Sequence, residues 1–183
     1  IWKNDEEKAA TCEAARELAA KLRPAIGRTE IDDRDNLRPG WKYSEWERKG
    51  VPLRLELGPR DLAQRSVMLK ARHDRAKNVV PFDGVVDGVR AELDRIQQDL
   101  YDRAVQRRAE NTHTVDSWDD LVKLYEGAGG FAWAHWCGDS ACEQTIQDKT
   151  GVTIRNIPFD RDTTAGQCVH CDKESIGRVL FAQ

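Results

Sequence analysis

The sequence predicts an α/β protein: a small mixed sheet with helices on its faces, then a long linking helix and a small α+β domain. The first half runs in the order helix, strand, loop, helix, strand, strand, which is typical of a small sheet covered by helices. Residues 83–110 form the clearest helical segment. Apolar residues recur there at spacings of four, three and four, at Val89, Leu93, Ile96 and Leu100. A helix of this length can bridge two bodies.

The first part begins with an amphipathic helix over residues 5–22, and we expect Pro24 to end it. The next expected elements are a short β-like segment at 28–31, a short helix carrying Trp41, Tyr43 and Trp46, a half-buried strand at 51–57, a turn at 58–60 and a strand at 66–72. Trp41 and Trp46 are expected in the core. A first strand would normally precede Asp5, and only Ile1 and Trp2 are available for it.

The second part follows a polar junction at residues 112–116. Its expected elements are a helix at 118–126, a glycine-rich turn at 127–130, an apolar strand at 131–136, a helix at 141–150 and strands at 152–157 and 176–181. These assignments predict a first domain over residues 1–82, a linking helix over 83–111 and a C-terminal domain over 112–183.

The charge is small overall but unevenly distributed. The net charge of −3 argues against a general nucleic-acid binder, and DNA is not an expected partner. Residues 28–75 carry 12 Lys and Arg against 9 Asp and Glu, whereas residues 113–183 carry 6 against 11. Any polyanion is therefore expected to meet the first half of the chain, with the second half as a support.

The chain shows no sign of membrane insertion or secretion. No apolar run approaches the ~18–20 residues that span a bilayer, and the opening residues lack the apolar core of a signal peptide. We therefore expect a cytoplasmic protein with no membrane partner. Because the chain lacks an initiating Met, we also expect a fragment of a longer protein.

Four of the five cysteines fall into two short pairs. Cys137 and Cys142 form C-x4-C, and 25 residues later Cys168 and Cys171 form C-x2-C. Two such pairs can supply four thiolates at the corners of a tetrahedron, which structural Zn²⁺ prefers. With all corners taken by protein, no position is left for water, so the site would be structural.

Other readings of the cysteines stay open. The four could be buried free thiols or a redox-active set, and the isolated Cys12 is expected in the core. His170 lies between two of the expected ligands and could replace one, although we expect its side chain to face outward. We assign no role to His113 or His135.

A block of the first half carries a family resemblance. It comprises Asp32-Asp33-Arg34-Asp35-Asn36, Pro39-Gly40-Trp41-Lys42-Tyr43, Glu45-Trp46-Glu47, Lys49-Gly50-Val51-Pro52 and Leu55-Glu56-Leu57-Gly58-Pro59-Arg60-Asp61. The block closely resembles the anticodon-binding domain of prolyl-tRNA synthetases of the archaeal/eukaryote-like group, a class IIa domain. In the second half, Trp136-Cys137-Gly138-Asp139, Cys142-Glu143, Ile157-Pro158-Phe159 and Arg178-Val179-Leu180-Phe181-Ala182 resemble the C-terminal zinc-binding domain of that group.

The resemblance covers nearly the whole chain from Asp5 onward and implies a function. It implies a proline–tRNA ligase, a class II aminoacyl-tRNA synthetase that activates proline with ATP and charges tRNA(Pro). The catalytic motifs of this class lie upstream in the family and are absent here, so this chain by itself is expected to catalyse nothing. ATP and Mg²⁺ would bind only to that missing catalytic domain. The full-length enzyme is expected to be a homodimer.

The chain also departs from the family pattern. After Ser66-Val67-Met68-Leu69 the family commonly has paired arginines and a Thr-Gly turn, whereas this chain has Lys70-Ala71-Arg72-His73-Asp74-Arg75. Family members commonly finish with a tyrosine, and this chain stops at Gln183.

Six residues are the expected anticodon contacts. A guanine presents N1–H and N2–H donors on its Watson–Crick edge, for which Asp and Glu are acceptors, while Arg or Lys reaches O6, N7 or a phosphate. Polar side chains that could make such contacts, at expected strand ends and in adjacent loops, are Arg34, Asn36, Glu56, Arg60, Asp61 and Lys70. Against this reading, Asp32, Asp33 and Arg34 could form an ion network within their own loop.

Two other functions compete with this one. The chain could be a free-standing anticodon-binding-like domain that serves as an interaction or regulatory subunit without ligase activity. A metal-dependent hydrolase or a redox protein would need an open coordination site or a reactive dithiol, which four paired cysteines without a nearby general base do not provide.

Overall fold

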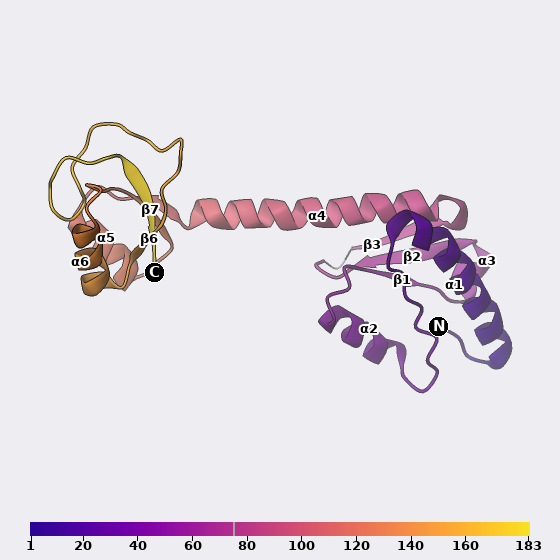
Figure 1. Cartoon of the computed structure of the whole chain (residues 1–183). Coiled ribbons are helices and arrows are strands. Elements are labelled where there is room, and N and C mark those ends of the chain that lie inside the picture. Colours follow the sequence, from indigo (N-terminus) through magenta and orange to yellow (C-terminus); the bar gives the residue numbers. More distant parts are fainter. Residues whose placement is uncertain (75) are drawn as a thin grey trace. The chain divides into compact units, whose positions relative to one another are not determined.

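The computed structural model describes residues 1–74 and 76–183, so Arg75, one of the residues that depart from the family pattern, lies outside the described part. The chain divides into two compact units, Ile1–Asp102 and Arg103–Gln183. Helix α4 (Val85–Glu110) begins in the first unit and continues into the second (Figure 1). The α/β class expected from the sequence is confirmed. Across the described residues, no helix is long and apolar enough to cross a membrane.

The first unit is built around a three-stranded sheet. Its elements are α1 (Asp5–Ile26), α2 (Pro39–Arg48), β1 (Leu53–Glu56), α3 (Pro59–Ala63), β2 (Ser66–Ala71), β3 (Lys77–Pro81), a 3-10 turn (Phe82–Gly84) and the first turns of α4. The strands lie in the order β1-β2-β3, and both neighbouring pairs are antiparallel. Side chains alternate between the two faces of each strand, so every second residue faces the same way.

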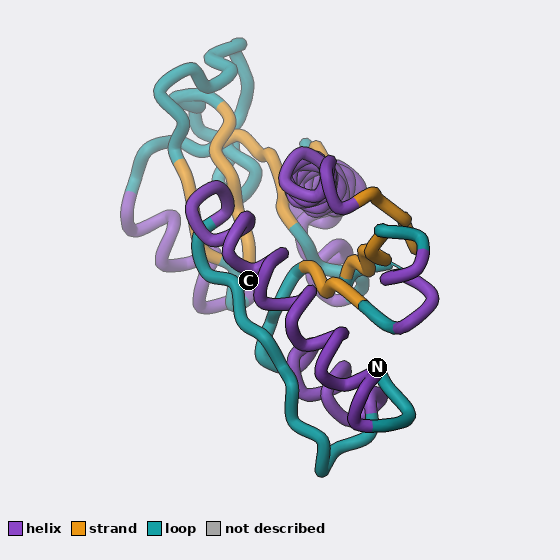
Figure 2. The backbone as a smooth tube through the Cα atoms, turned by 90° about the vertical axis from the view of Figure 1, so that its right-hand side faces the viewer, coloured by secondary structure: helices purple, strands orange, loops and turns teal. Residues whose placement is uncertain are grey.

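One face of this sheet carries the core of the unit. Leucines 18 and 22 of α1 and valines 85 and 89 of α4 pack there against Val67, Leu69 and Val80 of the sheet. Figure 2 looks nearly along α4 and shows its turns beside the strands. The other face meets α2, which Figure 1 shows on the opposite side of the sheet from α4. The guanidinium of Arg54, which faces away from the core, lies 3.9 Å from the ring centroid of Tyr43 on α2.

Helix α1 does not end where the sequence suggested. It begins after Asn4, whose side chain accepts a hydrogen bond from the Glu7 backbone N–H, and it continues past Pro24 to Ile26. A proline in the last turn removes only its own donor, and Gly27, with φ of +94°, still donates its N–H to the Arg23 carbonyl. The expectation that Pro24 ends the helix was therefore wrong, whereas Cys12 is buried as expected.

Three local assignments of the first unit differ from expectation. Residues 28–31 form no strand in the described structure, and the 58–60 turn is the start of helix α3, with Pro59 at its first position. Strand β3 (Lys77–Pro81) was not expected because its sequence opens with polar residues and closes with proline. Its backbone is extended because it pairs with β2, from Ser66 opposite Pro81 to Lys70 opposite Lys77.

The second unit is a four-stranded mixed sheet with two helices. Its elements after α4 are β4 (Thr112–Thr114), α5 (Trp118–Glu126), β5 (Phe131–His135), α6 (Ser140–Thr150), β6 (Thr153–Asn156) and β7 (Arg178–Ala182). The order is β4-β5-β7-β6, with β4 parallel to β5 and the other pairs antiparallel. The fully buried side chains of Leu121, Ile146, Val152, Val179 and Phe181 form its core. The helices and strands expected in this unit are confirmed to within two residues at each end, whereas strand β4 lies in the segment that was expected to be a polar junction.

Candidate functional site

Arg34 lies in an ion network of its own loop and helix α2. Its Nε and Nη2 donate to the Asp32 carboxylate at 2.9 and 2.7 Å, and Nη2 also lies 2.7 Å from Glu45 Oε2. Asp32 additionally accepts from the Trp46 indole N–H at 2.8 Å. These bonds, that of Arg34 foremost, hold the pKa of Asp32 well below its usual range. Of the Arg34 donors, Nη1 is the group left for a ligand within the described structure.

Glu56 is also paired internally. Arg54, two residues earlier on the same face of β1, donates from Nε to Glu56 Oε1 at 2.9 Å and from Nη1 to Glu47 Oε1 of α2 at 2.7 Å. Both Arg54 and Glu56 are mostly covered, with side chains 19% and 16% exposed. Sequence reasoning missed Arg54, although its alternation with Glu56 put the two on one face.

Arg60 and Asp61 are neighbours on α3 with different surroundings. The Asp61 carboxylate accepts the Gly58 backbone N–H at 2.9 Å and so caps the helix that carries it. Arg60 is exposed, and no partner of its guanidinium is recorded within residues 1–74 and 76–183. Asn36 is likewise exposed, in the loop that leads to α2.

Lys70 belongs to a row of cations that crosses the sheet. Register places Arg54 of β1 opposite Lys70 of β2, and Lys70 opposite Lys77 of β3, so the three side chains share the face away from the core. Arg72 follows two residues after Lys70, and a shallow pocket at this place is lined by Trp46, Glu47, Val51, Arg54, Lys70 and Arg72. Glu47 and Glu56 offset the charge of Arg54, whereas no ion pair of Lys70 or Lys77 is found in the described residues. Like charges directly opposite each other disfavour strand pairing, so an anion bound at Lys70 and Lys77 would relieve their repulsion.

The six expected contact residues thus occupy different places in the first unit. Arg34 and Asn36 lie before α2, Glu56 and Lys70 lie on the sheet face away from the core, and Arg60 and Asp61 lie on α3. No hydrogen bond or ion pair joins residues of one of these places to those of another among the described residues.

Trp41 is not a core residue, contrary to expectation. Its side chain is 72% exposed, whereas Trp46 on the same helix is partly buried and bonded to Asp32. At about 100° per residue, Trp41 lies about 140° around α2 from Trp46 and faces away from the side that packs on the unit. The periodicity of the sequence did not indicate that the indole of Trp41 is exposed to solvent.

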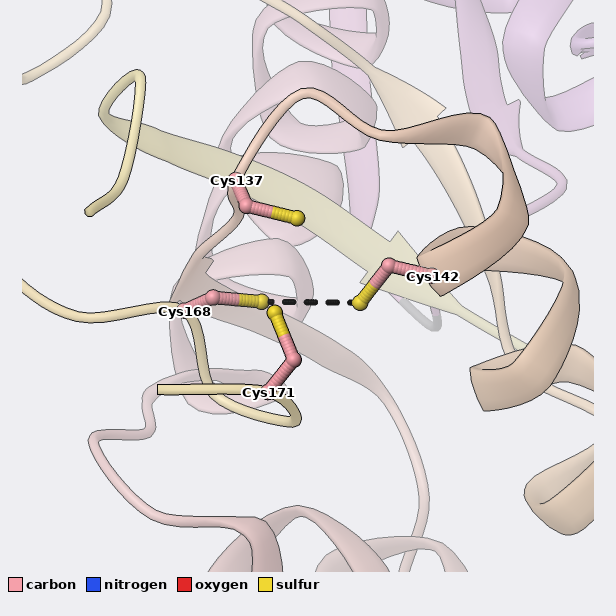
Figure 3. A group of neighbouring side chains, drawn as sticks. All are labelled: Cys137, Cys142, Cys168 and Cys171. Carbon is pink, nitrogen blue, oxygen red and sulfur yellow. Dashed lines mark hydrogen bonds between the residues drawn. The ribbon is translucent and has the colours of Figure 1, made fainter. Parts of the chain in front are cut away.

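The four paired cysteines meet in the second unit (Figure 3). All four Sγ atoms lie within 4.8 Å of one another, and Cys142 Sγ is 3.7 Å from Cys168 Sγ. A tetrahedron with Zn–S bonds of about 2.3 Å has edges of about 3.8 Å, so the sulfurs already stand near metal-binding positions. The 3.7 Å separation is much longer than a disulfide bond of about 2.05 Å, and the cysteines are free.

Each cysteine is placed by a tight local structure. Cys137 follows β5 and precedes Gly138, whose φ is +85°, and Cys142 lies in the first turn of α6, where the helix dipole favours a negative charge. Cys168 is nearly fully buried in the loop before β7. Burial opposes its ionisation, yet the backbone N–H groups of His170 and Cys171 lower the pKa of the Cys168 thiol. Burial raises the pKa of the Cys142 thiol, and a bound cation would favour its thiolate form.

His170 does not face outward. Its Nδ1 lies 3.5 Å from Cys142 Sγ, so the ring contacts a thiol of the cluster without replacing any of the four cysteines. His135, to which no role was assigned, is buried, and its Nδ1 lies 2.8 Å from Ser175 Oγ.

A second cluster of metal-type side chains joins the loop after β2 to α4. His73 Nε2 lies 2.9 Å from Asp99 Oδ2, and Arg95 contacts the carboxylates of Asp74, Glu92 and Asp99 at 2.5–2.8 Å. Because a guanidinium already holds these carboxylates, the cluster is a structural ion network between the sheet and the helix.

Comparisons with known proteins agree with the geometry of both units. The family described as "Anticodon binding domain" matches residues 3–92, and that described as "Prolyl-tRNA synthetase, C-terminal" matches residues 118–183. The proline–tRNA ligases of Roseiflexus sp. and Christiangramia forsetii are 43% and 42% identical to this chain over its full length. The crystal structure of prolyl-tRNA synthetase from Cryptosporidium parvum, complexed with L-proline and AMP, superimposes with a TM-score of 0.88 at 32% identity and covers 100% of the chain.

The chain spans 37–38% of the length of these relatives and of that solved structure. The two family matches follow each other along the chain in the order of its two units. The chain belongs to the prolyl-tRNA synthetase family, of which it carries the anticodon-binding and C-terminal domains.

Proposed function

We propose that the first unit binds the anticodon loop of tRNA(Pro), and that it serves a protein that joins proline to this tRNA. The observation that carries the proposal is the row Arg54, Lys70 and Lys77 across the sheet. Glu47 and Glu56 pair with Arg54, whereas in the described residues the ammonium of Lys70 makes only a long hydrogen bond of 3.4 Å to the Ala76 carbonyl. Such a row suits the phosphates of a single-stranded loop.

Base reading would use the other candidate residues of the first unit. We assign Arg60, Asn36 and Nη1 of Arg34 to direct contacts, because these groups are exposed or unused by the fold. Glu56 and Asp61 can accept from a guanine edge only with the carboxylate oxygen that their internal bonds leave free. The exposed indole of Trp41 offers a platform for an unpaired base, which is worth about 1–3 kcal/mol in stacking. The mixture of acids and bases fits the donors and acceptors of guanine.

We further propose that Cys137, Cys142, Cys168 and Cys171 hold a structural Zn²⁺. The sulfur spacing and the compact turns around each pair support this ligand set. With four thiolates bound, the ion has no open position, so it would stabilise the fold and take no part in chemistry. A reducing compartment such as the cytoplasm suits a site that depends on free thiols.

The remaining parts of the proposal rest on the family resemblance. As a proline–tRNA ligase, the whole protein would activate proline with ATP and Mg²⁺ in a catalytic domain that is absent from this chain, and it would act as a homodimer. We place the division of this chain at residues 1–82 for anticodon binding, 83–111 for the linking helix and 112–183 for the C-terminal domain.

The test is a titration of the chain with a proline-tRNA anticodon stem-loop and with a stem-loop whose two guanines are replaced. We expect at least tenfold tighter binding of the first, about 1.4 kcal/mol. The double variant Lys70→Gln/Lys77→Gln should weaken both complexes and reduce the slope of log K against log salt by about 1.4, which is 0.7 for each lost contact. Lys21→Gln is the control, because Lys21 lies on α1 and pairs with Glu17.

Each outcome has a distinct meaning. Equal binding of both stem-loops would leave backbone electrostatics as the only interaction and refute base reading. Absence of binding by the folded chain would refute the anticodon-binding role and favour an interaction or regulatory subunit.

A further inference from the structure

The imidazole of His170 connects the cysteine cluster to a lysine. Its Nδ1 lies 3.5 Å from Cys142 Sγ, and its Nε2 lies 3.1 Å from Lys149 Nζ. Cys142 and Lys149 are both on α6, seven residues apart, which is about two helical turns and so the same side of the helix. The His170 ring therefore bridges Cys142 and Lys149, two side chains whose spacing is set by helix α6.

Trp118 of α5 fixes the plane of this ring. The Trp118 and His170 ring centroids are 4.8 Å apart at an interplanar angle of 68°, an edge-to-face contact. The Lys149 ammonium also lies 5.5 Å from the centroid of the Trp118 ring. Contacts with Trp118, Cys142 and Lys149 thus restrain the position of one imidazole.

The lysine decides which ring nitrogen of His170 carries the proton. An ammonium group has donors and no acceptor, so Nε2 must accept from Lys149 and cannot carry a hydrogen. A neutral imidazole with a bare Nε2 carries its hydrogen on Nδ1. That hydrogen points at Cys142 Sγ, which accepts it.

We propose that His170 is a positioning residue for the metal site: with its tautomer set by Lys149, it donates Nδ1–H to the Cys142 thiolate. The inference rests on the zinc site proposed above. Four thiolates and one Zn²⁺ carry a net charge of −2, and N–H donors to the sulfurs offset this charge in a buried site. Backbone N–H groups serve Cys168 in this way, and the side chain of His170 serves Cys142.

The tautomer can be observed directly in the zinc-loaded wild-type chain. Long-range ¹H–¹⁵N correlation spectra distinguish a protonated ring nitrogen from a bare one, and assignment by comparison with His170→Asn identifies the signal. We expect His170 to be protonated at Nδ1 and bare at Nε2. Protonation at Nε2 alone would overturn the proposal, because Sγ would then face a nitrogen without a hydrogen. In Lys149→Glu the carboxylate accepts from Nε2–H, so the spectrum should change to show hydrogen on Nε2.

Zinc transfer to a chromogenic chelator gives a second readout. Loss of a group that supports a metal ligand typically costs 10–100-fold in metal affinity, so His170→Ala should release zinc at least tenfold faster. His170→Asn should stay within a few-fold of wild type, because the asparagine amide can donate from nearly the position of Nδ1. Lys149→Met should also release zinc faster, and His113→Ala and Lys123→Met serve as matched controls on β4 and α5.

The two proposals fail in different ways. A purified chain that binds no zinc stoichiometrically refutes the zinc site, and with it the role of His170. A chain that binds one zinc but releases it at the same rate in wild type, His170→Ala and Lys149→Met refutes the role of His170 alone. If His170→Ala does not fold, the wild-type tautomer and the rate of zinc release from His170→Asn still test the role of His170.

Discussion

Gly166 lies directly against the imidazole ring of His135, so that a Cβ atom at position 166 would come within 2.5 Å of His135 Nε2 and 2.7 Å of Cδ2. The ring cannot easily move aside, because it is buried and its Nδ1 is bonded to Ser175 Oγ at 2.8 Å. Ser175 in turn accepts the Gly177 N–H at 2.8 Å. One histidine on β5 therefore supports the loop from which Cys168 and Cys171 reach the four-cysteine cluster.

The contact predicts that Gly166→Ala destabilises the second unit. Overpacking of this kind typically costs about 1–3 kcal/mol. We expect the free energy of unfolding of residues 112–183 to fall by an amount in that range, measured by hydrogen exchange at increasing denaturant concentration. Gly40→Ala is the control, since a Cβ there meets no atom within 4 Å. An unchanged exchange pattern in Gly166→Ala would show that the loop adapts freely and that His135 does not hold it.

Removal of the proposed zinc ion should unfold one unit and spare the other. Structural zinc contributes roughly 10–16 kcal/mol of binding energy to small domains, whereas the first unit has its own core around Leu69 and Val89. Treatment with a strong chelator should therefore abolish exchange protection in residues 112–183 and leave β1, β2 and β3 protected. Retained protection of β5 and β7 without metal would contradict a folding role for the ion.

The contribution of Asp32 to the stability of the fold should be lost in acid. Its folded pKa is depressed, chiefly by the hydrogen bonds from Arg34, so its contribution to stability is fully present above the unfolded pKa of about 3.9 and is lost as the pH falls through the folded pKa. Wild type should thus exceed Asp32→Asn in free energy of unfolding at pH 6, and the gap should narrow steadily below pH 4. Denaturant titrations of both proteins across this range provide the measurement. A gap that does not change with pH would show that Asp32 acts through packing alone.

Trp41 should affect RNA binding without affecting stability. Because its side chain is 72% exposed, Trp41→Ala should leave the unfolding midpoint unchanged while weakening anticodon stem-loop binding by about 1–3 kcal/mol. Trp41→Phe should retain part of the affinity, since a smaller ring still stacks. Tyr101→Ala is the matched control, an aromatic side chain that is 60% exposed on α4. Equal losses in both variants would mean that Trp41 is not a specific platform.

Two helices of the chain were predicted almost at their observed bounds. The helix at 118–126 was predicted at its observed bounds, and that at 83–110 differs only because a 3-10 turn precedes Val85. Their signals are local: apolar residues at helical spacing and a serine that caps α5 at Ser117. Strand β3 and the absence of a strand at 28–31 could not be predicted in this way, because pairing with β2 decides which extended segment becomes a strand.

The sequence by itself determined the α/β class, the family and the four cysteines of the cluster, because helical periodicity and short cysteine spacings act over a few residues of chain. Only the tertiary structure decided which partners the other candidate side chains have and whether these side chains are exposed. It paired Arg34 with Asp32 and Glu45, lined up Arg54 with Lys70 and Lys77, exposed Trp41 and turned His170 toward Cys142. Hydrogen bonds and ion pairs act over about 3–4 Å between atoms, and only the packing of strands and helices brings residues distant in sequence that close.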